Sequence, residues 1–134
     1  MRGQLLNSKR IVVKIGTSSL THDNGNTNLD KMEKLARVLT DLNHQGKEII
    51  LVSSGAIGTG SRRIGLTERP QELEMKQATA AIGQAILMQI YEKFFAEYNQ
   101  VIAQVLLTKD VIEDSIKNQN AKNTLFALLK LGVI

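Results

Sequence analysis

Three short runs of apolar residues, rich in β-branched side chains, punctuate the chain. They cover residues 10–15, 48–53 and 101–107. Runs of this length and composition are typical of strands buried in a sheet, and helical patterns lie between them. Strands that alternate with helices favour parallel βαβ units, so the sequence predicts an α/β sandwich.

Apolar residues at intervals of three and four predict the helices. The first is expected over residues 29–46, with Gly46 as its C-cap and with Thr27 opening a sequence that resembles a capping box. A short helical stretch is expected after residues 54–60, and a last helix over residues 120–131.

The longest helical pattern, residues 77–98, has apolar side chains on nearly all sides. Such a helix is expected to be buried, and Pro70 is placed to open it. Gly83 would let a neighbouring segment approach closely. Near the end of the chain, Gly132 resembles a helix C-cap and residues 133–134 resemble the start of another strand, which predicts a truncated unit.

Composition and charge exclude several classes of function. The chain has 134 residues, a length that fits one domain, and a formal net charge of +4. The basic residues are scattered, aromatic residues make up 4% and Trp is absent, which argues against a nucleic-acid surface. Cysteine is absent, so cysteine nucleophiles and thiolate metal sites are excluded. No signal peptide or membrane-spanning run is visible, so we expect a cytoplasmic protein.

Segments rich in Gly, Ser and Thr follow the first two expected strands, at residues 14–19 and 53–60. Both are candidate phosphate or carboxylate sites, because backbone N–H groups in such loops and at helix N-termini bind anions. Neither matches a Walker A loop or a G-x-G-x-x-G fingerprint. Lys14 either meets a phosphate or is a strand-end lysine whose ammonium reaches water. Ser54 alternatively serves as the N-cap of the following helix.

The remaining polar residues have simpler interpretations. Thr108 is expected to start a helix, and residues 113–123 are expected to form a solvated loop and cap. His22 and His44 lie too far apart in sequence to suggest a metal site.

Three segments together resemble the amino acid kinase family, and within it the glutamate 5-kinases. They are residues 12–18, 52–57 and 76–84, and the resemblance extends over nearly the whole chain. It implies a three-layer αβα sandwich with a mainly parallel sheet. It also implies that ATP, with Mg²⁺, donates its γ-phosphoryl group to the side-chain carboxylate of L-glutamate in the first step of proline biosynthesis. Inhibition by proline and a homo-oligomer are expected on the same basis.

The resemblance also implies roles for six residues. Lys14 would be the catalytic lysine at the ATP phosphates, backbone N–H groups of Gly16 and Thr17 would bind the same phosphates, and Ser54, Gly55 and Ala56 would bind glutamate. Residues 1–134 would then be the N-terminal, substrate-binding half of a kinase domain. The nucleotide-binding half would lie beyond them, and the isolated chain would be inactive.

Two alternatives remain open at this point. Another amino acid kinase would phosphorylate acetylglutamate, aspartate, carbamate or a nucleotide. A non-catalytic α/β module would only hold an anion in the same loops.

Overall fold

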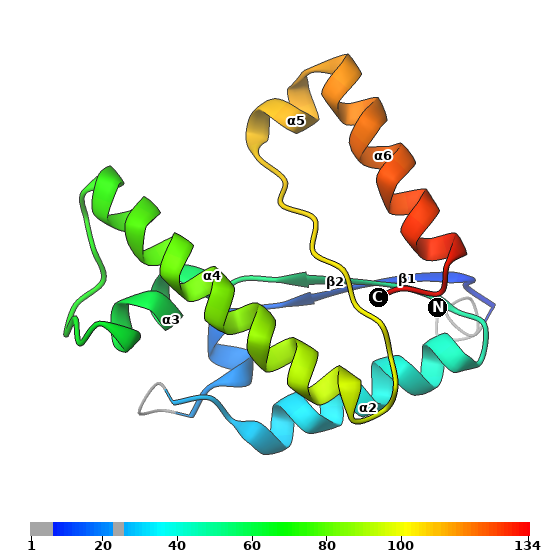
Figure 1. Ribbon diagram of the computed structural model, residues 1–134, viewed down its shortest axis with the longest axis horizontal. Coiled ribbons are helices and arrows are strands. Elements are labelled where there is room, and N and C mark those ends of the chain that lie inside the picture. Colours follow the sequence, from blue (N-terminus) through cyan, green and yellow to red (C-terminus); the bar gives the residue numbers. More distant parts are fainter. Residues whose placement is uncertain (1–6, 23–25) are drawn as a thin grey trace.

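The computed structural model describes residues 7–22 and 26–134, which form a small parallel sheet between helices (Figure 1). In chain order the elements are β1 (Arg10–Ile15), the 3₁₀ helix η1 (Thr17–Leu20), α2 (Leu29–His44), β2 (Glu48–Ser53), α3 (Ala56–Arg63), α4 (Leu73–Ala96), α5 (Lys109–Glu113) and α6 (Ser115–Lys130). None of the helices in these residues is both long and apolar enough to cross a membrane.

The two strands are parallel neighbours, as the first two apolar runs predict. Arg10 lies opposite Glu48, and Ile15 lies opposite Ser53, so both strands end at the same edge of the sheet. Along β1, exposed side chains alternate with partly buried ones. The sheet therefore has one face toward the core and one outer face.

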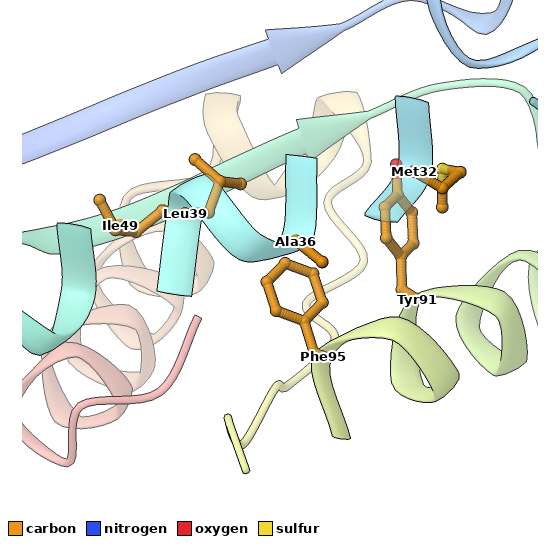
Figure 2. Close-up of a cluster of buried hydrophobic side chains, with 6 residues drawn as sticks. All are labelled: Met32, Ala36, Leu39, Ile49, Tyr91 and Phe95. Atoms are coloured by element: carbon orange, nitrogen blue, oxygen red, sulfur yellow. The ribbon is translucent and has the colours of Figure 1, made fainter. Parts of the chain in front are cut away.

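Helices α2 and α4 cover the inner face of the sheet. Between them and β2 lies a cluster of six buried side chains, drawn in Figure 2: Met32, Ala36, Leu39, Ile49, Tyr91 and Phe95. The three that belong to α2 are separated by four and three positions, which places them on one side of that helix. Burial of this cluster fixes α4 beneath the strands.

Helix α6 lies on the other side of the strands (Figure 1). The Arg10 guanidinium of β1 stands 4.9 Å from the centre of the Phe126 ring of α6, a cation–π contact. Farther along this face Val12 is 61% exposed and Val52 is 45% exposed, so α6 covers only one end. The expected α/β class with a parallel sheet and helices on both sides is confirmed.

The third apolar run is not a strand here, which corrects the prediction for residues 101–107. Among the residues that the structure describes, only Ile134 makes backbone hydrogen bonds with this run: the Ile134 N–H donates to Val101 O at 3.2 Å, and the Ala103 N–H donates to Ile134 O at 2.9 Å. This is the pattern of a single parallel bridge. A cavity of about 380 Å³ separates the run from the free edge of β2. Without a partner along its length, the run cannot form a ladder.

Helix boundaries follow the caps rather than the apolar pattern. Asn28, not Thr27, caps α2, because its side-chain oxygen accepts from the Lys31 N–H at 3.0 Å. Thr27 instead pairs with Thr21 in an isolated antiparallel bridge, which removes it from the helix. The capping box expected at Thr27 is therefore wrong.

The starts of α6 and α4 also differ from the predicted ones. Asp114 accepts hydrogen bonds from two N–H groups in the first turn of α6, so residues 115–123 are helix rather than the expected solvated loop. Helix α4 begins after Glu72, and Pro70 lies before it rather than opening it. The expected burial of α4 holds on one side only, since Ile82 is 38% exposed. Thr108 does start a helix, α5.

Candidate functional site

The two loops singled out in the sequence meet at the carboxyl edge of the sheet. Gly16 follows β1, Ser54 and Gly55 follow β2, and all three line one small cleft together with Thr59 and Arg62 of α3. The enclosed space is about 20 Å³, room for little more than one water molecule. A larger ligand would therefore lie across the mouth of the cleft.

Ser54 ties the ends of the two strands together. Its N–H and its hydroxyl both donate to the carbonyl oxygen of Ile15, each at 3.3 Å. The alternative role of Ser54 as an N-cap is wrong, because Gly55 occupies that position. Gly55 has φ +117°, in the left-handed region that favours glycine, so the chain turns sharply from β2 into α3.

The N-terminus of α3 has no side-chain cap. Its first backbone bond runs from the Thr59 N–H to Gly55 O at 2.9 Å. The N–H groups of Ala56, Ile57 and Gly58 precede that bond, and helix geometry gives them no acceptor within the helix. These donors and the helix dipole create positive potential next to the cleft.

Helices α3 and α4 cross at Gly60 and Gly83, and we call this contact the glycine crossing. A Cβ added to Gly60 would stand 1.9 Å from the carbonyl oxygen of Thr79, and one added to Gly83 would stand 1.7 Å from the carbonyl oxygen of Ala56. The backbones of the two helices are thus in direct contact, which confirms the close approach expected at Gly83. Since Ala56 is the first residue of α3, this contact also fixes the loop beside the cleft.

Lys14 does not join the other candidates in the cleft. It lies on the outer face of the sheet, exposed, one residue before the end of β1. Its ammonium makes no ion pair with any residue that the structure describes. Thr17 begins η1 directly after Gly16, which lines the cleft, and Lys14 approaches the same sheet edge from the opposite face.

Thr59 and Arg62 also line the cleft, although neither was among the candidate residues predicted from the sequence. They follow Gly55 by four and seven positions, so one face of α3 carries all three toward the cleft. That spacing is visible in the sequence and could have identified them. Arg62 is the one cationic side chain among the described residues that line the cleft, which gives an anion a further reason to bind there.

A tyrosine stands directly behind the second loop. The Tyr91 hydroxyl lies 2.6 Å from Oγ of Ser53, the last residue of β2. Burial raises the pKa of Tyr91, and the hydrogen bond with Ser53 opposes that rise in part. The Tyr91 hydroxyl therefore stays protonated at neutral pH.

A comparison with known proteins identifies the family to which this chain belongs. The model of the amino acid kinase family matches residues 9–134. The chain belongs to the amino acid kinase family. This agrees with the parallel sheet and with the two Gly-containing loops at its carboxyl edge.

Curated relatives narrow the similarity within the amino acid kinases. Over all 134 residues the chain is 54% identical to proteins named glutamate 5-kinase from Clostridium perfringens and Listeria innocua, and it covers 50% and 49% of them. It is 55% identical over 125 residues to a glutamate 5-kinase from Caldanaerobacter subterraneus, of which it covers 34%. The chain therefore spans about half the length of the first two relatives.

Proposed function

We propose that this chain is the substrate-binding half of a glutamate 5-kinase. The observation that carries the proposal is the 54% identity to glutamate 5-kinases, which extends over the whole chain. In the proposed reaction a side-chain carboxylate oxygen of L-glutamate forms a bond to the γ-phosphorus of ATP. The bond from that phosphorus to the bridging oxygen breaks, and L-glutamyl 5-phosphate and ADP result. This would be the first step of proline biosynthesis, in the cytoplasm.

The cleft suits a reaction between two anions. A carboxylate must approach a phosphate chain, so positioning and charge neutralisation dominate the barrier. The uncapped N-terminus of α3 supports binding of glutamate by Ser54 and by the N–H groups of Gly55 and Ala56. The Ser54 hydroxyl already donates to Ile15 O, so it remains free to accept a hydrogen bond from the ammonium group of an amino acid.

The phosphates are proposed to lie across the end of β1. Backbone N–H groups of Gly16 and Thr17 would bind them from the cleft side, and Lys14 would reach them from the outer face of the sheet. A lysine that forms no ion pair with the described residues suits this role, because none of their carboxylates competes with the phosphate. Its ammonium would stabilise the charge that moves onto the leaving oxygen.

We propose that Mg²⁺ accompanies ATP in this reaction. Among the described residues, no group of three or more His, Asp or Glu side chains converges, and no carboxylate lines the cleft. Hard cations prefer oxygen ligands, which phosphates and water also supply. We therefore assign no residue here to the metal.

ADP release by the protein expressed from its complete reading frame tests the proposal. Glutamate, acetylglutamate, aspartate, carbamate and nucleoside monophosphates are compared as acceptors. Turnover with glutamate alone supports the proposal, and turnover with another acceptor but not glutamate contradicts it. Proline added to the same assay tests inhibition, and light scattering tests the expected homo-oligomer.

Ser54→Ala is expected to raise the KM for glutamate and to leave the KM for ATP nearly unchanged. Loss of a hydrogen bond to a charged group costs about 1.5–3 kcal/mol, or roughly 10–150-fold in affinity. Steady-state kinetics with each substrate varied in turn measures both constants. Ser115→Ala, at an exposed serine of α6, is the control. A lower unfolding temperature with an unchanged KM for glutamate would restrict Ser54 to its tie with Ile15.

A further inference from the structure

Helix α4 contacts both ends of the loop that joins β2 to α3. At one end the Tyr91 hydroxyl lies 2.6 Å from Ser53 Oγ. At the other end the Gly83 backbone packs against the carbonyl oxygen of Ala56. Gly83 and Tyr91 are eight positions apart, about two helical turns. The loop between these contacts contains Ser54, the proposed glutamate-binding residue.

We propose that Tyr91 is a positioning residue, which sets the geometry of glutamate binding by holding Ser53. The inference rests on the proposed function, because it concerns the same loop. Ser53 and Ser54 are adjacent, and their side chains bond in different directions: Ser53 to α4 and Ser54 to the end of β1. Together these bonds fix where β2 ends and where the following N–H groups point.

Tyr91 is suited to this role because it is held firmly itself. Its side chain is 5% exposed, and its ring lies 6.4 Å from that of Phe95, centre to centre. Figure 2 shows the ring rising from α4 beside Met32, within the buried cluster. A hydroxyl at the tip of a fixed ring has few alternative positions, so Ser53 is held at one place.

Loss of the hydrogen bond between Tyr91 and Ser53 is expected to cost free energy at the end of β2. If phenylalanine replaces tyrosine, Ser53 Oγ loses its short bond in a part-buried position and keeps only a long contact, 3.5 Å, to the carbonyl oxygen of Ser54. A polar group left with so weak a partner is costly there. The serine would turn toward another acceptor, and the end of β2 would move with it. The displacement would reach Ser54 through the shared peptide bond.

A double-mutant cycle tests the coupling in the protein expressed from its complete reading frame. Tyr91→Phe and Ser53→Ala are each expected to raise the KM for glutamate by roughly 2–12-fold, the range for one net hydrogen bond. The double variant should be no worse than the poorer single variant, because both changes remove the same bond. The KM for ATP should change little in all three.

Two controls separate positioning from a general loss of stability. Tyr98→Phe removes another tyrosine hydroxyl near the end of α4, one that donates to Glu33 away from the cleft, and should leave the KM for glutamate unchanged. Ser53→Thr keeps the hydroxyl and should restore a KM near that of the wild type. If Tyr91→Phe does not fold, the comparison of Ser53→Ala with Ser53→Thr decides, and equal KM values for those two overturn the proposal.

Independent, multiplicative effects of Tyr91→Phe and Ser53→Ala would overturn the proposal. A lower unfolding temperature with an unchanged KM would do the same. Failure of the proposed function is seen separately, since the wild type would then not turn over glutamate. The cycle is in that case run with the acceptor that the wild type does phosphorylate.

Discussion

Gly83→Ala is expected to destabilise the protein by about 3 kcal/mol or more, the upper range for overpacking a filled site. Alanine is the better helix former by about 1 kcal/mol, so the sequence change alone would favour α4. The new Cβ would stand 1.7 Å from the carbonyl oxygen of Ala56, however, and that neighbour is backbone rather than a flexible side chain. Helix α3 must therefore move away from α4. Chemical denaturation of the wild type and the variant measures the difference.

Gly16→Ala is the matched control for this substitution. Gly16 has φ −80°, an ordinary value, and an added Cβ would find only Ser19 Oγ, 3.9 Å away. The free energy of unfolding should therefore stay within about 0.5 kcal/mol of the wild-type value. Equal losses at Gly16 and Gly83 would contradict the close contact between α3 and α4.

Lys14→Ala is expected to lower kcat by about 10²–10³-fold in the protein expressed from its complete reading frame. The ammonium is needed most as charge moves in the transition state, so kcat should fall more than the KM for glutamate rises. Because the side chain is exposed and forms no ion pair with the described residues, the unfolding temperature should hardly change.

Lys34→Ala is the control for the loss of one positive charge. Lys34 is exposed on α2 and does not line the cleft, so kcat should be unaffected. A Lys14→Ala variant with wild-type kcat would assign Lys14 to the alternative role of a strand-end lysine. Lys14→Arg refines the result, because a guanidinium keeps the charge but not the shape of the ammonium.

The strands and the close helix contact were predictable because their causes are local in sequence. A six-residue run rich in Ile and Val that is bounded by Gly or Ser predicts a strand, and both runs formed strands, β1 and β2. The expected burial is wrong for most of their length, since no residue of β1 and only Ile49 of β2 is buried. A lone glycine within an apolar helical pattern indicates a close neighbour, and Gly83 has one in α3. The register of the strands follows from their common length and parallel direction.

The wrong predictions concern segments whose structure is determined by contacts with other segments rather than by their own residue pattern. Residues 101–107 have the composition of a strand, but a strand also needs a hydrogen-bonded neighbour along its length, and composition does not supply one. The N-cap of α2 is Asn28 rather than the expected Thr27, because Thr27 pairs with Thr21 in an isolated β-bridge. Both outcomes depend on contacts that no single segment encodes.

The candidate site was predicted in part. Gly16, Ser54 and Gly55 could be grouped from the rule that parallel strands end at one sheet edge, and they do line one cleft. Lys14 follows from the same strand but lies on the other face, since side chains alternate along β1. The contact of Tyr91 with the second loop could not be predicted, because no pattern in the sequence indicates that residue 91 lies next to residue 53.

The glycine crossing makes the two walls of the cleft mechanically unequal. With the backbones of α3 and α4 in contact, neither helix can slide or tilt without carrying the other. The wall formed by Ser54 and α3 therefore behaves as one rigid body with α4. At the opposite wall, where Gly16 leads into η1, a Cβ added to Gly16 would meet Ser19 Oγ at an ordinary distance of 3.9 Å, so the backbone there is less tightly enclosed. We therefore expect the β1 side to adjust more than the β2 side when a ligand arrives, within the limit set by the hydrogen bonds from Ser54 to Ile15.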